Sequence, residues 1–157
     1  MPITLDTPLA LYSIPAIWYT AFYPVNAKFV SMLKTTGYDN LKPRANTGRV
    51  KELPFVDTKV AERYARLDGA HENGMENLPL WIGAILAGHI AGLSNRTMNI
   101  FSVAYITTRM LYNYVYINQS TIAQSNLRSG LYFFGLSMPL TLLIKSANKL
   151  RRIADQY

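Results

Sequence analysis

The sequence contains no cysteine, so disulfide bonds and thiolate metal ligands are excluded. Any thiol chemistry would therefore need a thiol brought by a bound ligand. Only two histidines are present, His71 and His89, and neither belongs to a metal-ligand spacing such as HxxxH. We therefore predict no metal site and expect both histidines to contact neighbouring helices.

Charged residues are scarce, at 16% of the chain, and they are unevenly placed. No charged side chain occurs in residues 7–27, 77–95 or 129–144, and residues 97–127 carry only Arg109. A helix that crosses a bilayer needs roughly 17 to 25 mostly apolar residues. The pattern predicts an all-α integral membrane four-helix bundle with spans near residues 7–33, 70–93, 97–118 and 128–146.

The length of 157 residues fits one domain over residues 1–157, and nothing in the sequence suggests a second. A soluble four-helix bundle with unusually apolar helices is the alternative. It is less favoured because a soluble helix normally shows a charged stripe, which residues 79–94 and 130–144 lack.

More than half of the 16 Lys and Arg residues lie between Lys28 and Arg66. The positive-inside rule then places a loop of residues 34–58 in the cytosol, although basic residues near the C-terminus would fall on the opposite side. The net charge of +7 comes with no nucleic-acid motif, so we predict no nucleic-acid partner and expect the basic groups to meet anionic membrane lipids. An intracellular membrane such as the endoplasmic reticulum is the expected location.

Small residues recur every fourth position in the second predicted span. They form one line of Gly83, Ala87 and Ala91 and a neighbouring line of Ala84, Gly88 and Gly92. Because such lines allow helix backbones to approach closely in lipid, we expect this face, and the first line in particular, to pack on another helix or subunit. We expect the loop of residues 34–58 to be irregular and residues 118–126 to connect the last two spans.

Polar residues stand inside the predicted spans at helical spacing, where they are costly and usually functional. Asn73 and Glu76 share one face of the second span, and Arg109, Tyr112 and Tyr116 share one face of the third. These groups either bind a polar ligand or hold the helices together. A buried arginine almost requires a carboxylate partner, so we predict an ion pair between Glu76 and Arg109.

The fourth span opens with Arg128, Ser129 and Tyr132. A guanidinium beside a hydroxyl can hold a thiol as its thiolate, because the cation lowers the thiol pKa and the hydroxyl donates to the anion. The alternative is that Arg128 is a flanking arginine that meets lipid headgroups.

Three segments together resemble the MAPEG family, the membrane-associated proteins in eicosanoid and glutathione metabolism. They are ERYARLDGAHENGMENLPLW at residues 62–81, RMLYNYVY at residues 109–116 and RSGLY at residues 128–132. The sequence looks closer to fungal and bacterial members than to animal eicosanoid enzymes. The resemblance implies a homotrimer of four-helix subunits that binds glutathione at each subunit interface.

The resemblance also implies roles for individual residues. Arg128, Ser129 and Tyr132 would be catalytic and surround the sulfur, whereas the expected glutathione-binding residues are Asn73, Glu76, Arg109, Tyr112 and Tyr116. The implied activity is that of a membrane-bound glutathione transferase acting on a lipophilic small-molecule substrate, with peroxidase or isomerase activity on the same thiolate as alternatives. A non-catalytic lipid-binding or scaffold protein is the alternative.

Two residues depart from the family pattern. Gly69 stands where many members carry arginine and Glu72 where some do, which would weaken binding of the glutathione carboxylates. Arg66, one turn before Gly69, is the candidate to compensate.

Overall fold

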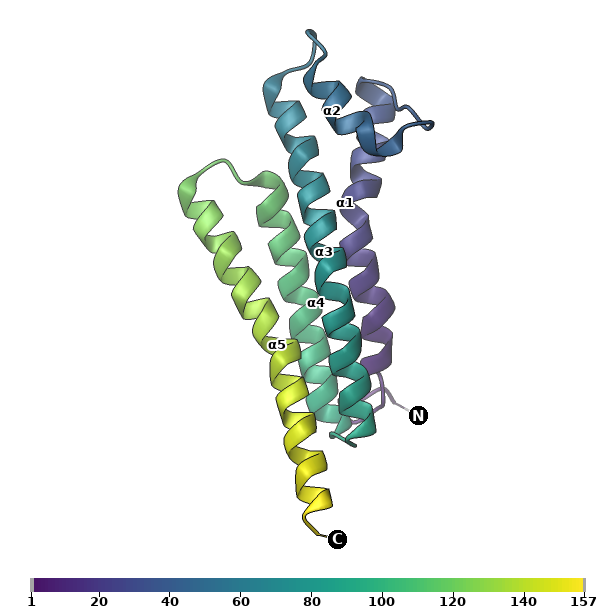
Figure 1. The fold of residues 1–157 in the computed structure, drawn as a ribbon, viewed down its shortest axis with the longest axis vertical. Coiled ribbons are helices and arrows are strands. Elements are labelled where there is room, and N and C mark those ends of the chain that lie inside the picture. The colour runs from purple at the N-terminus through teal and green to yellow at the C-terminus, as the bar shows by residue number, and fades with distance from the viewer. Residues whose placement is uncertain (1, 157) are drawn as a thin grey trace.

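The computed structural model describes residues 2–156, and over these residues the fold is entirely helical (Figure 1). Its four long helices are α1 (Ser13–Thr35), α3 (Thr58–Ile90), α4 (Asn95–Asn118) and α5 (Ile122–Ala154). The shorter elements are η1 (Ala10–Tyr12), η2 (Pro43–Ala45) and α2 (Asn46–Lys51).

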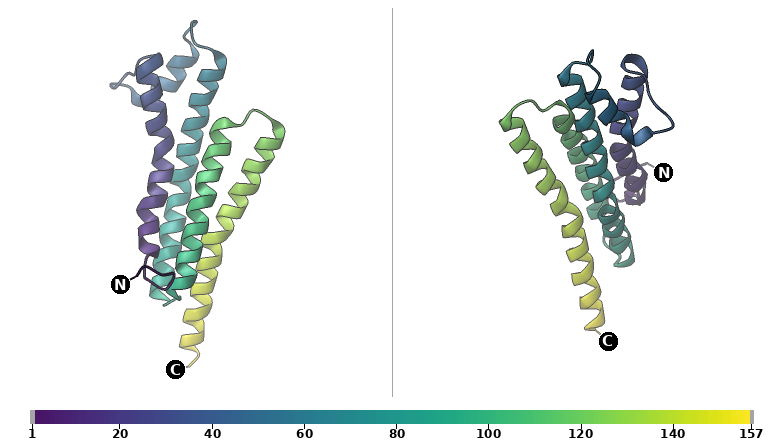
Figure 2. Two further views of the ribbon diagram at one scale, coloured as in Figure 1. Left: turned by 180° about the vertical axis from the view of Figure 1, so that it is seen from behind. Right: turned by 45° about the horizontal axis from the view of Figure 1, so that its top comes forward.

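The long helices lie along one another: α1 packs on α3 and α4, and α5 packs on α3 and α4. The segment with α2 lies at one end, and the N-terminus lies at the other beside the α3–α4 turn (Figure 1). The first half of α5 inclines away from α4, as both views in Figure 2 also show. This divergence separates α5 from the other helices near the end where α2 lies.

The starts of α3 and α4 follow from capping residues in the sequence. Helix α3 begins at Thr58 and runs without a break into the second apolar segment. The Asp57 side chain accepts a hydrogen bond from the Lys59 amide at 2.8 Å, and the Ser94 hydroxyl accepts one from Thr97 at 3.3 Å.

The fourth helix is longer than predicted at both ends, and the predicted connector over residues 118–126 is wrong. Thr121 and Gln124 form a capping box, with each side chain accepting from the other residue's backbone amide. This box starts α5 at Ile122, so that Ser125 and Asn126 are helical despite their polarity. Only residues 119–121 connect α4 to α5.

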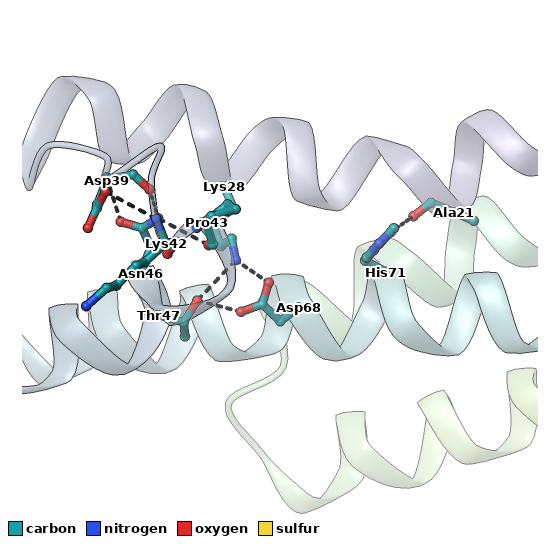
Figure 3. Close-up of polar contacts among 9 residues, drawn as sticks. All are labelled: Ala21, Lys28, Asp39, Lys42, Pro43, Asn46, Thr47, Asp68 and His71. Atoms are coloured by element: carbon teal, nitrogen blue, oxygen red, sulfur yellow. Dashed lines mark hydrogen bonds and ion pairs between the residues drawn. The ribbon is translucent and has the colours of Figure 1, made fainter.

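The loop of residues 34–58 is more ordered than predicted. The Asn46 side chain, 1% exposed, organises it: Nδ2 donates to the carbonyl oxygens of Asp39 and Pro43, and Oδ1 accepts from the Asp39 amide (Figure 3). These bonds fold the chain back and seed α2, which a pattern of Gly, Asn and Pro residues does not reveal.

The main apolar core centres on Trp81 of α3. Its ring stacks on Tyr105 of α4 with the ring centroids 4.2 Å apart, and its Nε1 donates to the Ser13 hydroxyl of α1 at 3.0 Å. Trp81 therefore holds three long helices together near the N-terminal end of the chain.

The surface of α4 is apolar where a soluble helix would be polar. Asn99, Ser102 and Thr108 are buried, whereas Val103 and Met110 are exposed. This arrangement suits a lipid environment. By length and composition, α5 is the one helix of residues 2–156 that is apolar enough to cross a membrane, and only 22% of its most apolar window is buried. The four predicted spans therefore stay a prediction.

Close packing within the chain uses the second line of small residues. A Cβ on Gly88 would lie 2.5 Å from the Met98 sulfur, and Ala84 is fully buried. Gly83 is exposed with nothing near it. Along the first line, Gly83 is exposed, Ala87 is half-buried and Ala91 is buried, so Gly83 makes no close contact inside the described chain. Packing of this line on another subunit stays a prediction.

The helices α1 and α3 approach most closely where Gly74 meets Ala21, since a Cβ on Gly74 would lie 2.6 Å from the Ala21 Cβ. One turn away, His71 donates from Nδ1 to the Ala21 carbonyl oxygen at 2.8 Å (Figure 3). The predicted helix-contact role of His71 is therefore confirmed.

A buried ion pair ties the loop to the helices. Lys28 of α1 is 5% exposed and pairs with Asp68 of α3, and Thr47 of α2 bonds to both side chains (Figure 3). The lysine's charge is thus neutralised at the end of the uncharged segment of α1.

We expect Asp68→Asn to destabilise the protein by about 3 kcal/mol, because it leaves the Lys28 ammonium buried without a counter-charge. The double variant K28M/D68L removes both charges and should lose less stability. Thermal unfolding of detergent-purified protein measures both. A double variant that is less stable than Asp68→Asn would contradict this account.

Candidate functional site

A cavity of about 460 Å³ lies where α3, α4 and α5 meet, a size suited to a small polar ligand. All the predicted site residues except Arg109 line it. The complete lining is Gly69, Glu72, Asn73, Glu76, Tyr112, Tyr116, Arg128, Ser129, Tyr132 and Phe133. The structure therefore brings together three polar sets that are far apart in the sequence.

Helical periodicity explains how each helix presents its residues. On α3 the cavity receives side chains at spacings of three and four, and on α4 it receives Tyr112 and Tyr116. The first half of α5 inclines away from α4 (Figure 1), and the cavity there is lined by Arg128 of α5 together with residues of α3 and α4. Three regular helices thus hold the lining without help from any loop.

Arg109 lies directly behind this lining. It is 4% exposed, its Nη2 donates to Asn73 Oδ1 at 2.9 Å, and its guanidinium carbon lies 4.6 Å from the Tyr112 ring centroid. The predicted ion pair with Glu76 is wrong: in the part of the chain that the structure describes, the ion pairs join Lys28 to Asp68 and Arg66 to Glu62. The Glu76 side chain is exposed instead.

Arg109 is therefore a buried cation held by an amide and an aromatic face rather than by a carboxylate. Its neutral partners supply one hydrogen bond and one aromatic face but leave its charge uncompensated. An anion in the neighbouring cavity would be stabilised by that charge, because a buried environment screens charges less than water does.

Arg128 is placed by aromatic contacts. Its guanidinium carbon lies 5.0 Å from the Tyr116 ring centroid. The Tyr112 ring centroid lies 5.6 Å from that of Tyr116 and 6.3 Å from that of Tyr132. The three tyrosines thus form one wall beside Arg128.

The charges of the cavity are separated by helix. Glu72 and Glu76 come from α3, whereas Arg128 comes from α5 and Arg109, on α4, lies behind the lining. A ligand that carries both an ammonium group and anionic groups can place each of them against the opposite charge.

Ser129 is not yet oriented toward a ligand. Its hydroxyl donates to the Ser125 carbonyl oxygen one turn earlier in α5, at 3.1 Å. A rotation about χ1 would release it, at the cost of a helical hydrogen bond of ordinary strength.

The structure explains why position 69 is a glycine, which the sequence alone did not reveal. A Cβ at this position would lie 2.5 Å from the Tyr116 hydroxyl oxygen. The glycine therefore makes room for Tyr116, and no arginine fits here while Tyr116 keeps this position. Neither Gly69 nor Tyr116 signals this contact in the sequence, because it depends on how α3 packs against α4.

Arg66 does not take the place of the missing arginine. Its Nε donates to the Ile117 carbonyl oxygen at 3.1 Å, and its Nη1 lies 3.6 Å from Glu62 Oε2. It is also absent from the lining of the cavity. The suggestion that it compensates for Gly69 finds no support in this arrangement.

An all-helical chain with an apolar outer surface and a polar cavity between helices is typical of membrane proteins that act on small molecules. Comparison with known families matches residues 9–148 to the MAPEG family, and the chain belongs to this family of helical membrane proteins. Neither the curated proteins nor the solved structures contain a match to the chain.

Two substitutions of Asn73 should change stability in opposite directions. Asn73→Ala leaves an Arg109 donor unpaired and should cost about 1.5 to 3 kcal/mol, the range for a hydrogen bond to a charged group. Asn73→Asp gives Arg109 a carboxylate and should raise the melting temperature of the ligand-free protein. Equal losses of stability in both variants would show that Arg109 needs no counter-charge.

We expect Gly69→Ala to leave the fold intact or stabilise α3 by up to about 1 kcal/mol, since alanine favours helix over glycine. It should displace Tyr116 and weaken ligand binding by roughly tenfold, the effect of one lost hydrogen bond. Gly130→Ala is the matched control, because it lies beside Arg128 in α5 with open space around it. Equal binding by both variants would contradict the role assigned to Gly69.

Proposed function

We propose that this protein is a membrane-bound glutathione transferase that activates the glutathione thiol as a thiolate and directs it at a lipophilic electrophile. Family membership supports a role in glutathione or lipid metabolism. The observation that carries the specific proposal is the cavity in which Arg128 and Ser129 face Asn73, Glu76 and the tyrosine wall.

Glutathione fits the separated charges of this cavity. Its ammonium group can pair with Glu76 or Glu72, whereas its carboxylates and thiolate need positive potential. Arg128 supplies that potential directly, and Arg109 supplies it through the Asn73 and Tyr112 side chains that it contacts. Asn73, Glu76, Tyr112 and Tyr116 would hold the peptide part of the molecule.

In the proposed reaction, Arg128 stabilises the thiolate and Ser129, once rotated, donates a hydrogen bond to the sulfur. Tyr132 lies on the same side of the cavity and would also border the sulfur. The sulfur then forms a bond to an electrophilic carbon, and the leaving group departs with the electron pair of the bond that breaks. The main gain comes from holding an ionised nucleophile beside its target. Peroxidase or isomerase chemistry would use the same thiolate.

The expected setting is a homotrimer in the endoplasmic reticulum or another intracellular membrane, with four spans per subunit and lipid around them. The exposed Phe133 and Phe134 support access from the bilayer, because they extend the apolar surface beside Arg128. We also propose that the protein is closer to the fungal and bacterial members of the family than to the animal eicosanoid enzymes.

A non-catalytic lipid-binding or scaffold role is the second candidate, and two observations favour it. The Ser129 hydroxyl donates its hydrogen bond within α5, to the Ser125 carbonyl oxygen. In addition, the α3 side of the cavity has Gly69 and Glu72 and no cation. Such a protein would hold a ligand in the cavity without ionising it.

Replacing Arg128 tests the proposed function. Arg128→Ala should leave the protein folded, because the residue lies near the start of α5 and is half-buried. The thiol pKa of bound glutathione should rise toward the free-thiol value of roughly 8.5. Thiolate ultraviolet absorbance at pH 7 and turnover of an activated aryl halide should both fall, and turnover should partly recover as the pH rises.

Arg128→Lys serves as the control, since it keeps the charge but loses the planar fork, and it should retain part of both signals. Full thiolate absorbance and activity in the Ala variant across this pH range would remove Arg128 from the mechanism. Glutathione binding without thiolate or turnover in the unaltered protein would favour the non-catalytic candidate.

A further inference from the structure

A second cavity, of about 560 Å³, lies on a different side of α4 from the candidate active site, where α1 and α4 face each other beside α3. The two cavities share no lining residue. Ala16, Ile106 and Met110 form its apolar end, and Arg63 and Asn118 stand at the other. We call this cavity the α1–α4 groove.

The groove is elongated along the helices. Its α4 side runs from Ile106 to Asn118, which is about 18 Å at the helical rise of about 1.5 Å per residue. Since α1 and α4 both run toward the end where α2 lies, Arg63 and Asn118 mark that end of the groove (Figure 1). The charge of Arg63 and the amide of Asn118 thus lie at one end of a mainly apolar lining.

A buried acceptor in the groove has no donor. Asn113 lines the groove and is 5% exposed, and its Nδ2 donates to the Thr20 carbonyl oxygen at 2.7 Å. This bond fixes which amide atom is the donor, so Oδ1 must accept, yet it has no partner among residues 2–156. A buried polar atom left in this state is costly, and because Asn113 lines the groove, a ligand in the groove lies next to this side chain.

Arg63 supplies a charge at the polar end. Its side chain is exposed, and it takes part in none of the ion pairs formed within residues 2–156. The nearest arginine on the same helix, Arg66, is held by Glu62 and by the Ile117 carbonyl oxygen. Arg63 is therefore available to an anion at the mouth of the groove.

We propose that the α1–α4 groove binds a single-chain anionic lipid. Its charged group pairs with Arg63, an O–H or N–H next to that group donates to Asn113 Oδ1, and its hydrocarbon chain lies between α1 and α4. Arg63, the unpaired Asn113 Oδ1 and the apolar residues Ala16, Ile106 and Met110 follow one another along the groove. A single-chain anionic lipid carries its charged group, its donor and its hydrocarbon chain in the same order. This site is separate from the proposed glutathione site.

A helix from a second copy of the chain fits the groove less well. Backbone N–H groups inside a helix are already bonded within that helix, so a packed helix offers a donor only through a polar side chain. The Tyr19, Tyr23 and Tyr114 rings at the rim are exposed and suit an interface with lipid headgroups.

The test uses 1-oleoyl lysophosphatidic acid, which has a phosphate, a free hydroxyl beside it and one acyl chain. Native mass spectrometry of the full-length protein in neutral detergent measures binding. The 2-deoxy analogue lacks only the hydroxyl and should bind roughly tenfold more weakly, the effect of one lost hydrogen bond. The uncharged 1-oleoylglycerol lacks the phosphate and should also bind more weakly.

Variants locate the binding. Arg63→Ala should weaken binding of the lysophosphatidic acid by roughly tenfold or more, whereas Lys59→Ala, which removes an equal charge one turn earlier in α3, should not. Ala16→Phe should block the apolar end, whereas Val103→Phe, on the outer surface of α4, should not. Arg128→Ala should spare lipid binding while it weakens thiolate formation, which keeps this test independent of the proposed function.

Equal binding of the deoxy analogue, or equal effects of Arg63→Ala and Lys59→Ala, would overturn the proposal and indicate detergent-like adsorption. Cross-linking tests whether a second copy of the chain occupies the groove. Because the chain has no cysteine of its own, an introduced cysteine can form a disulfide only with the same cysteine of another copy. A Tyr114→Cys variant that forms an intermolecular disulfide under mild oxidation, with loss of lipid binding, would show that protein covers the groove.

Discussion

The buried guanidinium of Arg109 is the constraint around which the site is built. A cation that is 4% exposed would normally be matched by a carboxylate, but here Asn73 and the Tyr112 ring take that place. The arrangement keeps α3 and α4 together while leaving positive potential behind the cavity. Arg128 adds a second cation from α5, so the cavity is suited to an anion before any ligand is bound.

The shape of the cavity depends on two features of the backbone. Gly69 lets the Tyr116 hydroxyl approach α3, and Tyr116 in turn supports Arg128 through its ring. The first half of α5 also inclines away from α4 (Figure 2), and Arg128 of α5 lines the cavity together with residues of α3. Filling the glycine position would therefore act on the cation two helices away. The departure of Gly69 from the family pattern is thus a change of geometry as well as a loss of charge.

Much of the helical framework was predictable from local signals. The uncharged segments indicate the long helices, and the spacing of Tyr112 and Tyr116 indicates a shared face. Features that depend on contacts between helices were not predictable. Arg109 bonds to Asn73, whereas the Glu76 side chain is exposed and lines the cavity without an ion pair to Arg109. The partners of Lys28 likewise come from α2 and α3, distant in sequence.

The central claim is that this cavity binds glutathione and holds its sulfur as an anion. Calorimetric titration with glutathione at pH 7, repeated in buffers that differ in ionisation enthalpy, measures the protons released on binding. The account predicts release approaching one proton for each bound glutathione, and none for S-methylglutathione, which has no thiol proton. Binding of both compounds with no proton release would contradict the claim, as would a failure of glutathione to bind.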